Sequence, residues 1–190
     1  GALAGTTVDL TAEASRPAAN DMVRATVFAE AGGSNPAELA RRVNQDIAEG
    51  LKTIKGKAGV SVKSGRQSTF PVYGQNQKID SWRVHSELIL ESRDAAAVSE
   101  LLGQLQQMRL AVGSVSQLPA PETRRKVEDE ATRDAIGAFR QRAAVVAEVL
   151  GPQAICGAFS GPSFAEEVAA GQPTAVTLAA TARWYSNAAG

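Results

Sequence analysis

Residues 58–107 constrain the fold most, because they combine a long β-hairpin pattern with a following amphipathic helix. In the return strand an apolar set (Trp82, Val84, Leu88, Leu90) alternates with a polar set (Arg83, His85, Glu87, Glu91). A period of two predicts a strand in a sheet with one wet face. The pattern therefore predicts that His85, the single histidine, is an exposed surface residue. A pH-sensing role is the alternative for this side chain.

The preceding residues predict two strands. Apolar and polar residues alternate over residues 7–14 and again over 22–31. Pro, Asn and Asp in the intervening residues 15–21 favour a turn. We therefore expect the two strands to form a hairpin.

A helix is predicted to begin at Asn35. Asn35 suits the N-cap, Pro36 the first helical position, and Glu38 can reach back to the cap. Apolar residues then recur every three or four positions: Leu39, Val43, Ile47, Leu51 and Ile54. This stripe is typical of a helix that packs on a sheet, and we expect charges off the stripe, including Arg42 and Asp46, to be solvated.

The hairpin pattern predicts a strand at residues 60–72 with a bulge at Ser64-Gly65, followed by a turn at 74–77. Ser92 is the predicted N-cap of a helix at residues 93–108. Its predicted inward residues are Val98, Leu101, Leu102 and Leu105.

The pattern of the remaining chain predicts a short strand at residues 110–116, a helix at 122–150 and a final strand at 174–185. No definite structure is predicted for residues 152–173. The second half of the helix has a core stripe comprising Ile136, Phe139, Ala143, Val146 and Leu150. Its first half carries charges of both signs, which suit solvent or a partner subunit. Our candidate subunit contact comprises Arg124, Arg125, Glu128 and Asp129.

Composition argues against several function classes. Lys and Arg number 20, as do Asp and Glu, so no net charge attracts the chain to nucleic acid. One His and one Cys offer little for metal binding or acid–base catalysis, and no dinucleotide or P-loop glycine motif occurs. We therefore expect no catalytic residues, no metal and no cofactor. No apolar run approaches the roughly 20 residues of a membrane span.

Aromatic residues gather in the hairpin. Phe70, Tyr73 and Trp82 could stack on a ligand, but without a basic surplus nearby they are better explained by core or subunit packing.

Several motifs resemble the SIMPL-domain family, which includes the YggE-like proteins and the Brucella periplasmic immunogen. They are Leu10-Thr-Ala-Glu-Ala-Ser15, Val62-Lys-Ser-Gly65 with Thr69-Phe-Pro-Val-Tyr73, Trp82 opening the strand that ends Leu88-Ile-Leu-Glu-Ser-Arg-Asp94, and Glu122-Thr-Arg-Arg125 with Glu128-Asp-Glu-Ala131 leading to Ala138-Phe-Arg-Gln-Arg-Ala143. The resemblance implies an α+β fold, export to the periplasm or cell envelope, oligomers in some members, and stress tolerance without known catalysis. The small-x-small pattern Ala2-Leu3-Ala4 also fits an exported protein whose leader has been removed.

A second resemblance covers a short stretch near the C-terminus. Residues 160–180, beginning Ser160-Gly-Pro-Ser-Phe-Ala-Glu-Glu, are similar to a segment of bacterial NAD(P)-dependent glycerol-3-phosphate dehydrogenases. The glycine-rich nucleotide loop and the catalytic-lysine regions of that family have no counterpart here. A relic or fragment of such an enzyme is therefore the alternative function.

These observations predict an α+β protein, with an antiparallel sheet, helices packed on one face and a long projecting third helix. We expect residues 1–151 to form the SIMPL-like domain, and residues 152–190 to complete it with a final strand. The predicted function is non-enzymatic: self-association, as a homo-oligomer, or partner binding in the cell envelope.

Overall fold

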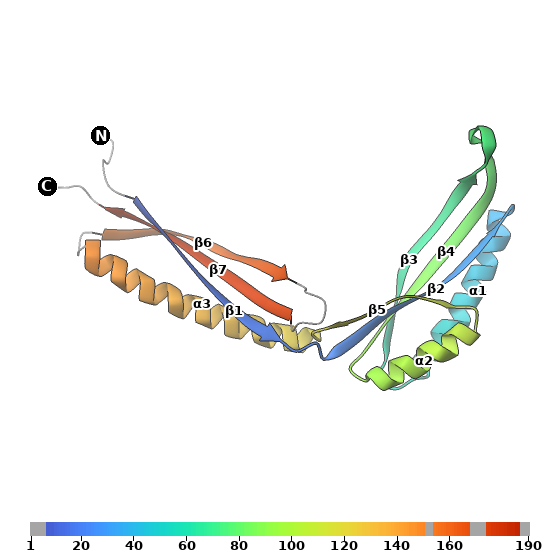
Figure 1. Ribbon diagram of the computed structural model, residues 1–190, viewed down its shortest axis with the longest axis horizontal. Helices are drawn as coiled ribbons and strands as arrows, with labels where there is room; N and C mark the ends of the chain where they lie inside the picture. The colour runs from blue at the N-terminus through green and yellow to red at the C-terminus, as the bar shows by residue number, and fades with distance from the viewer. Residues whose placement is uncertain (1–6, 151–153, 168–173, 187–190) are drawn as a thin grey trace. The chain divides into compact units, whose positions relative to one another are not determined.

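The computed structural model describes residues 7–150, 154–167 and 174–186 (Figure 1). The chain divides into two compact units. One unit comprises residues 20–120, and the other comprises residues 1–19 and 121–190. Each unit has its own antiparallel sheet, which confirms the α+β class but replaces the expected single sheet with two.

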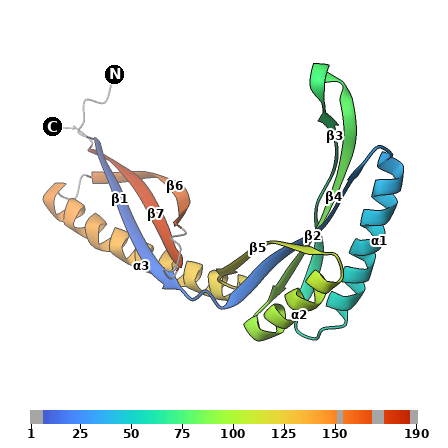
Figure 2. The same cartoon turned by 45° about the vertical axis from the view of Figure 1, so that its right-hand side comes forward.

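The sheet of the 20–120 unit has four strands in the order β3-β4-β2-β5. Their bounds are β2 (Met22–Gly33), β3 (Ser61–Tyr73), β4 (Ile79–Ser92) and β5 (Ala111–Leu118). Helices α1 (Pro36–Lys55) and α2 (Ala95–Gln107) pack against this sheet (Figure 2). A short 3-10 helix, η1 (Gln75–Gln77), lies in the β3–β4 turn.

The core of this unit lies between the sheet and the two helices. Its buried side chains are Val23, Ala25, Val27, Ala29, Val43, Ile54, Val84, Leu88, Leu90, Val98, Leu101, Leu105 and Leu110. The predicted stripe of α1 is confirmed, because Val43 and Ile54 are buried and Leu39, Ile47 and Leu51 pack against the same cluster. Since side chains alternate across a strand, the intervening residues of β2 and β4 lie on the opposite face.

One helix cap agrees with the sequence expectation and one differs from it. Asn35 caps α1 as predicted, accepting hydrogen bonds from the backbone N–H groups of Ala37 and Glu38 at 3.1 and 3.3 Å. The α2 cap, however, is Asp94 and not Ser92. The Ser92 hydroxyl instead donates to the Gly59 carbonyl at 2.7 Å and accepts from the Asp94 N–H at 3.0 Å.

The other unit has a three-stranded sheet in the order β1-β7-β6. It comprises β1 (Thr7–Ala18), β6 (Ala154–Glu167) and β7 (Thr174–Ser186), and α3 (Pro121–Leu150) packs against β1 and β7. The predicted final strand is thus present, and it pairs with the first strand. The strand β6 was not predicted.

The predicted hairpin between residues 7–14 and 22–31 is wrong. Both edges of β2 are occupied, one by β4 and one by β5, whereas β1 pairs with β7. Residues 15–18, assigned to a turn, continue β1. Because β1 is an edge strand, it tolerates Pro17, which lacks a backbone donor.

The predicted core stripe of the third helix is partly wrong. Phe139 is buried, but Ile136 is 44% exposed. The buried positions recur every four residues and are Val127, Ala131, Ala135 and Phe139. Ile136 directly follows Ala135, so it lies about 100° around the helix from that stripe. Ala143 and Val146 pack beside Phe139, as predicted, and the Leu150 side chain lies outside the described residues.

Candidate functional site

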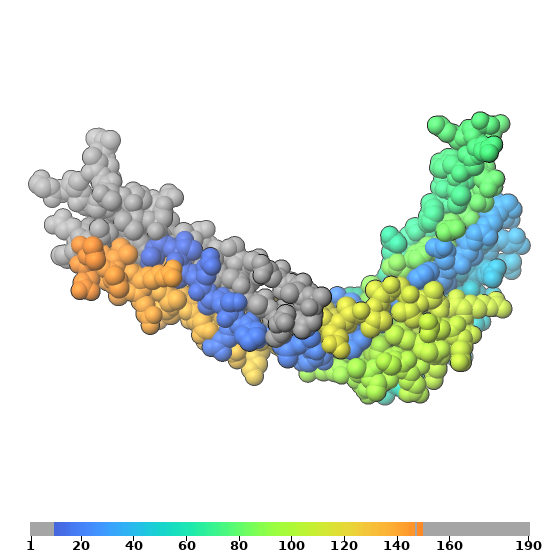
Figure 3. Space-filling model, viewed as in Figure 1, coloured from blue at the N-terminus to red at the C-terminus, as the bar shows by residue number. Residues whose placement is uncertain are grey.

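The candidate site is the far end of the β3–β4 hairpin, which extends past the end of β2 (Figures 1 and 3). The last residue of β2, Gly33, lies opposite Trp82, whereas β3 and β4 continue to pair as far as Tyr73 and Ile79. The end of the hairpin is therefore a two-stranded ribbon. We call residues 70–82 the hairpin tip.

Large apolar side chains are exposed on the hairpin tip. Phe70, Tyr73 and Ile79 are 42%, 62% and 50% exposed. Phe70 lies opposite Arg83, and Tyr73 lies opposite Ile79. Large apolar residues are more often buried, so their exposure on one ribbon makes the hairpin tip a candidate contact surface.

The backbone of the turn is tightly constrained. The Gly74 N–H donates to the Lys78 carbonyl at 2.9 Å, closing the turn. Asn76 and Gln77 have φ values of 65° and 57°, in the left-handed region that Asn tolerates better than most residues. A Cβ added at Gly74 would lie 3.2 Å from the Cβ of Asp80, so a larger residue would crowd the turn.

Below the tip, His85 lies between two carboxylates on the sheet face away from α1 and α2. Its Nδ1 is 3.0 Å from Oε2 of Glu30, and its Nε2 is 2.8 Å from Oε1 of Glu87. The ring stacks on Phe28 at a centroid distance of 4.8 Å. A neutral imidazole has one N–H, so only the doubly protonated ring donates to both carboxylates.

Two arginines, Arg66 of β3 and Arg83 of β4, extend this arrangement. Arg83 lies 3.2 Å from Glu30, and Arg66 lies 3.5 Å from Glu87. The Arg66 backbone N–H also donates to Glu87 at 3.3 Å. We call Glu30, Arg66, Arg83, His85 and Glu87 the charged network. It ties β2, β3 and β4 together at the base of the hairpin tip.

A β-bulge brings the backbone of β3 close to the charged network. The β3–β4 register shifts between Ser64 and Gln67, which confirms the predicted bulge. A Cβ at Gly65 would lie 2.9 Å from the Cβ of Glu87, so glycine permits this close approach.

The network changes the ionisation of Glu87. The hydrogen bond from His85 is the largest cause that lowers the pKa of Glu87, and the Arg66 N–H and guanidinium lower it further. Burial acts in the opposite direction and does not outweigh these contacts. Glu87 therefore stays ionised to lower pH than an ordinary glutamate.

The prediction that His85 is an exposed surface residue is wrong. His85 is only 8% exposed. The alternation placed it on the correct face, but Phe28 and Glu30 of β2 and Glu87 of β4 surround the ring. The signal in the sequence is the pair of charged residues, Arg83 and Glu87, that flank the lone histidine two positions away on either side.

The predicted subunit contact lies on α3. Arg125 and Asp129 are exposed, whereas Arg124 and Glu128 are partly buried. Other charges of α3 bind within the unit: Arg16 of β1 lies 2.5 Å from Asp134 and 3.5 Å from Glu130. This pairing raises the pKa of Arg16 and lowers that of Asp134, in each case chiefly through their shared hydrogen bond. A partner role for the predicted contact stays a prediction.

Among the described residues, no group of three or more His, Cys, Asp or Glu side chains is placed to hold a metal ion. None of the described helices combines the length and the apolar character of a membrane span. The side chain of Cys156 lies outside the described residues.

The fold and the site define an α+β protein with two antiparallel sheets and an exposed apolar hairpin tip above a charged network. The SIMPL family model, described as a protein of unknown function (DUF541), matches residues 8–183. The chain belongs to this family, as its motifs indicated.

Two curated relatives match a much shorter stretch. Glycerol-3-phosphate dehydrogenase [NAD(P)+] from Dechloromonas aromatica is 86% identical over 35 residues, which cover 18% of this chain and 11% of the enzyme. The same enzyme from Aromatoleum aromaticum is 70% identical over 37 residues, covering 20% of this chain and 11% of the enzyme. The chain thus spans about a tenth of the length of these relatives.

Solved structures show weaker similarity. The designed protein Foldit4 has a TM-score of 0.35 at 11% identity, covering 50% of this chain and 97% of that chain. An amidase of the hydantoinase/carbamoylase family from Burkholderia vietnamiensis has a TM-score of 0.32 at 10% identity, covering 56% and 27%. A tripeptidase from Staphylococcus aureus has a TM-score of 0.29 at 11% identity, covering 56% and 30%.

Proposed function

We propose that this SIMPL-family protein acts by association and not by catalysis, as an exported envelope protein whose hairpin tip binds a second copy of the chain. The observation that carries the proposal is the exposure of Phe70, Tyr73 and Ile79 on a ribbon that extends past β2. Export and a link to stress tolerance rest on the family resemblance. Binding of another envelope protein by the same surface is the alternative outcome.

The chemistry of the hairpin tip suits a protein interface. Aromatic side chains are enriched among the residues that dominate binding energy, and a polar rim normally surrounds them. Lys78 and Asp80 flank Ile79, so the tip carries opposite charges on either side of an exposed apolar residue. A two-fold symmetric contact requires such self-complementarity, because each residue meets its own partner set on the other copy.

The charged network favours a well-defined position of the hairpin. It links β2, β3 and β4 through side chains just below the tip. A contact surface that is ordered before binding loses less conformational entropy when the complex forms. The isolated two-stranded end of the hairpin would otherwise be marginally stable.

Light scattering after size-exclusion chromatography tests the proposal. We expect the parent to associate in a concentration-dependent way, and the variant Tyr73→Ser/Ile79→Ser to shift toward the monomer. Val115→Ser is the matched control, because Val115 is a similarly exposed apolar residue on β5, away from the tip. A parent that stays monomeric at every concentration, or equal effects of the tip and control variants, would contradict self-association through the tip.

A further inference from the structure

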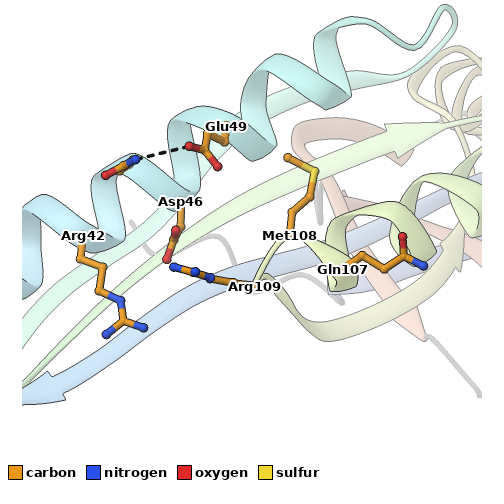
Figure 4. Close-up of a pocket in the computed structure, with 7 residues that line it drawn as sticks. Arg42, Asp46, Glu49, Gln107, Met108 and Arg109 are labelled. Atoms are coloured by element: carbon orange, nitrogen blue, oxygen red, sulfur yellow. Dashed lines mark hydrogen bonds between the residues drawn. The ribbon is translucent and has the colours of Figure 1, made fainter.

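A recess opens on the surface of the 20–120 unit, between α1 and the residues that end α2 (Figure 4). Its volume is about 360 Å³. The lining residues are Arg42, Gln45, Asp46, Glu49, Gln107, Met108 and Arg109. Small-molecule sites have volumes from roughly 300 Å³ upward, so the recess has room for a small ligand.

A glycine in α1 allows the two walls of the recess to lie close together. Arg42, Asp46 and Glu49 lie on one face of α1, because they are spaced by four and three residues. A Cβ added at Gly50 would clash with the Leu110 side chain, which is buried in the core beside it. The absence of a side chain at Gly50 therefore lets α1 approach the end of α2.

Arg109 occupies an unusual backbone position in the opposite wall. Its φ is 65°, in the left-handed region where glycine is the common residue after a helix. The turn is closed by the N–H groups of Met108 and Leu110, which donate to the Leu105 carbonyl at 3.0 and 3.2 Å. An arginine therefore occupies a backbone position that favours glycine. This backbone strain indicates a role for the Arg109 side chain.

The charges lining the recess are balanced. Arg42 and Arg109 supply two guanidinium groups, and Asp46 and Glu49 supply two carboxylates. Figure 4 shows the Asp46 carboxylate directed toward the Arg109 side chain. Glu49 lies one turn further along the same face of α1 and accepts a hydrogen bond from Gln45 at 3.4 Å.

We propose that this recess binds a small zwitterion of the α-amino-acid class. Arg42 and Arg109 hold its carboxylate, because guanidinium groups match carboxylate geometry. Asp46 and Glu49 hold its ammonium group. A simple anion would pair with the two arginines but also lie near the two carboxylates, and a simple cation would pair with the carboxylates but lie near the arginines, so each should bind less well than a zwitterion. This site is separate from the hairpin tip and does not depend on its function.

Titration calorimetry tests the proposal with L-alanine and glycylglycine as probes, and with propionate and propylammonium as singly charged controls. We expect saturable binding of at least one zwitterion and at least tenfold weaker binding of the controls. Arg109→Gly should weaken zwitterion binding about tenfold or more while keeping the fold, since glycine suits the left-handed backbone. Arg41→Gln is the matched control, because Arg41 pairs with Glu38 outside the recess.

A second variant separates lost binding from lost structure. Asp46→Asn removes one carboxylate, so it should weaken zwitterion binding and strengthen propionate binding, a reversal that unfolding would not produce. No saturable binding of either zwitterion up to about 10 mM would overturn the proposal. Equal affinity for propionate, or zwitterion binding unchanged by Arg109→Gly, would also overturn it.

Discussion

The Nε2 of His85 lies 2.8 Å from the Glu87 carboxylate two residues further along the same strand. Both side chains lie on the sheet face away from the helices, because residues two apart in a strand point the same way. The second ring nitrogen faces Glu30 at 3.0 Å. The imidazole therefore links two carboxylates on adjacent strands, at the base of an exposed hairpin.

The first prediction concerns acid stability. The pKa of Glu87 is lowered from 4.5, so Glu87 contributes stability that is present above that pH and is lost as the pH falls through its folded-state pKa. Glu87→Gln should cost about 1–3 kcal/mol of unfolding free energy at neutral pH. The difference from the parent should shrink as the pH falls below 4.5 and through the lowered pKa of Glu87.

Urea denaturation across this pH range measures the effect. Glu100→Gln is the control, because Glu100 forms an exposed pair with Lys57 and should change stability by less than about 1 kcal/mol. A Glu87→Gln variant whose deficit is the same at every pH would show that ionisation of Glu87 does not contribute to stability.

The second prediction concerns two helical glycines. Gly50→Ala should destabilise the protein by up to about 2 kcal/mol, because the clash of the new methyl group with buried Leu110 outweighs a helix-propensity gain of up to about 1 kcal/mol. Gly103→Ala should be neutral or stabilising by up to about 1 kcal/mol, since the position is open and alanine favours a helix. Thermal melts compare the two variants. Equal effects would mean that α1 does not pack closely on Leu110.

The third prediction tests the α3 contact. If Arg124, Arg125, Glu128 and Asp129 contact a partner subunit, Arg124→Glu/Arg125→Glu should reduce the assembly mass and leave the circular dichroism spectrum unchanged. The association should also weaken with salt in the parent, because exposed charges are screened. An assembly mass that the double substitution does not change would exclude these α3 residues from the subunit contact.

The fourth prediction concerns nicotinamide cofactors. The chain lacks the glycine-rich loop that holds a pyrophosphate at a helix N-terminus, so NADH and NADPH should not bind. Calorimetry with each cofactor measures this directly. Saturable micromolar binding of either would favour the dehydrogenase-fragment alternative over association.

The sequence alone predicted the elements that depend on nearby residues. The cap at Asn35, the α1 stripe and the alternation in β4 follow from side chains within a few turns or strand positions. The bulge after Ser64 is also local, and the structure confirms it. These features were readable because propensity and hydrophobic period act over short distances along the chain.

The tertiary structure decided which strands pair and which side chains are covered. Strand β1 pairs with β7, more than 150 residues further along the chain, and no local pattern specifies that choice. Alternation placed His85 on a face, but Phe28 and Glu30 lie on a different strand, β2, and determine the environment of the ring. The recess likewise needs Arg42 and Arg109 from separate elements. The period of a sequence pattern predicts which face a side chain lies on, whereas the residues that contact that side chain depend on long-range packing.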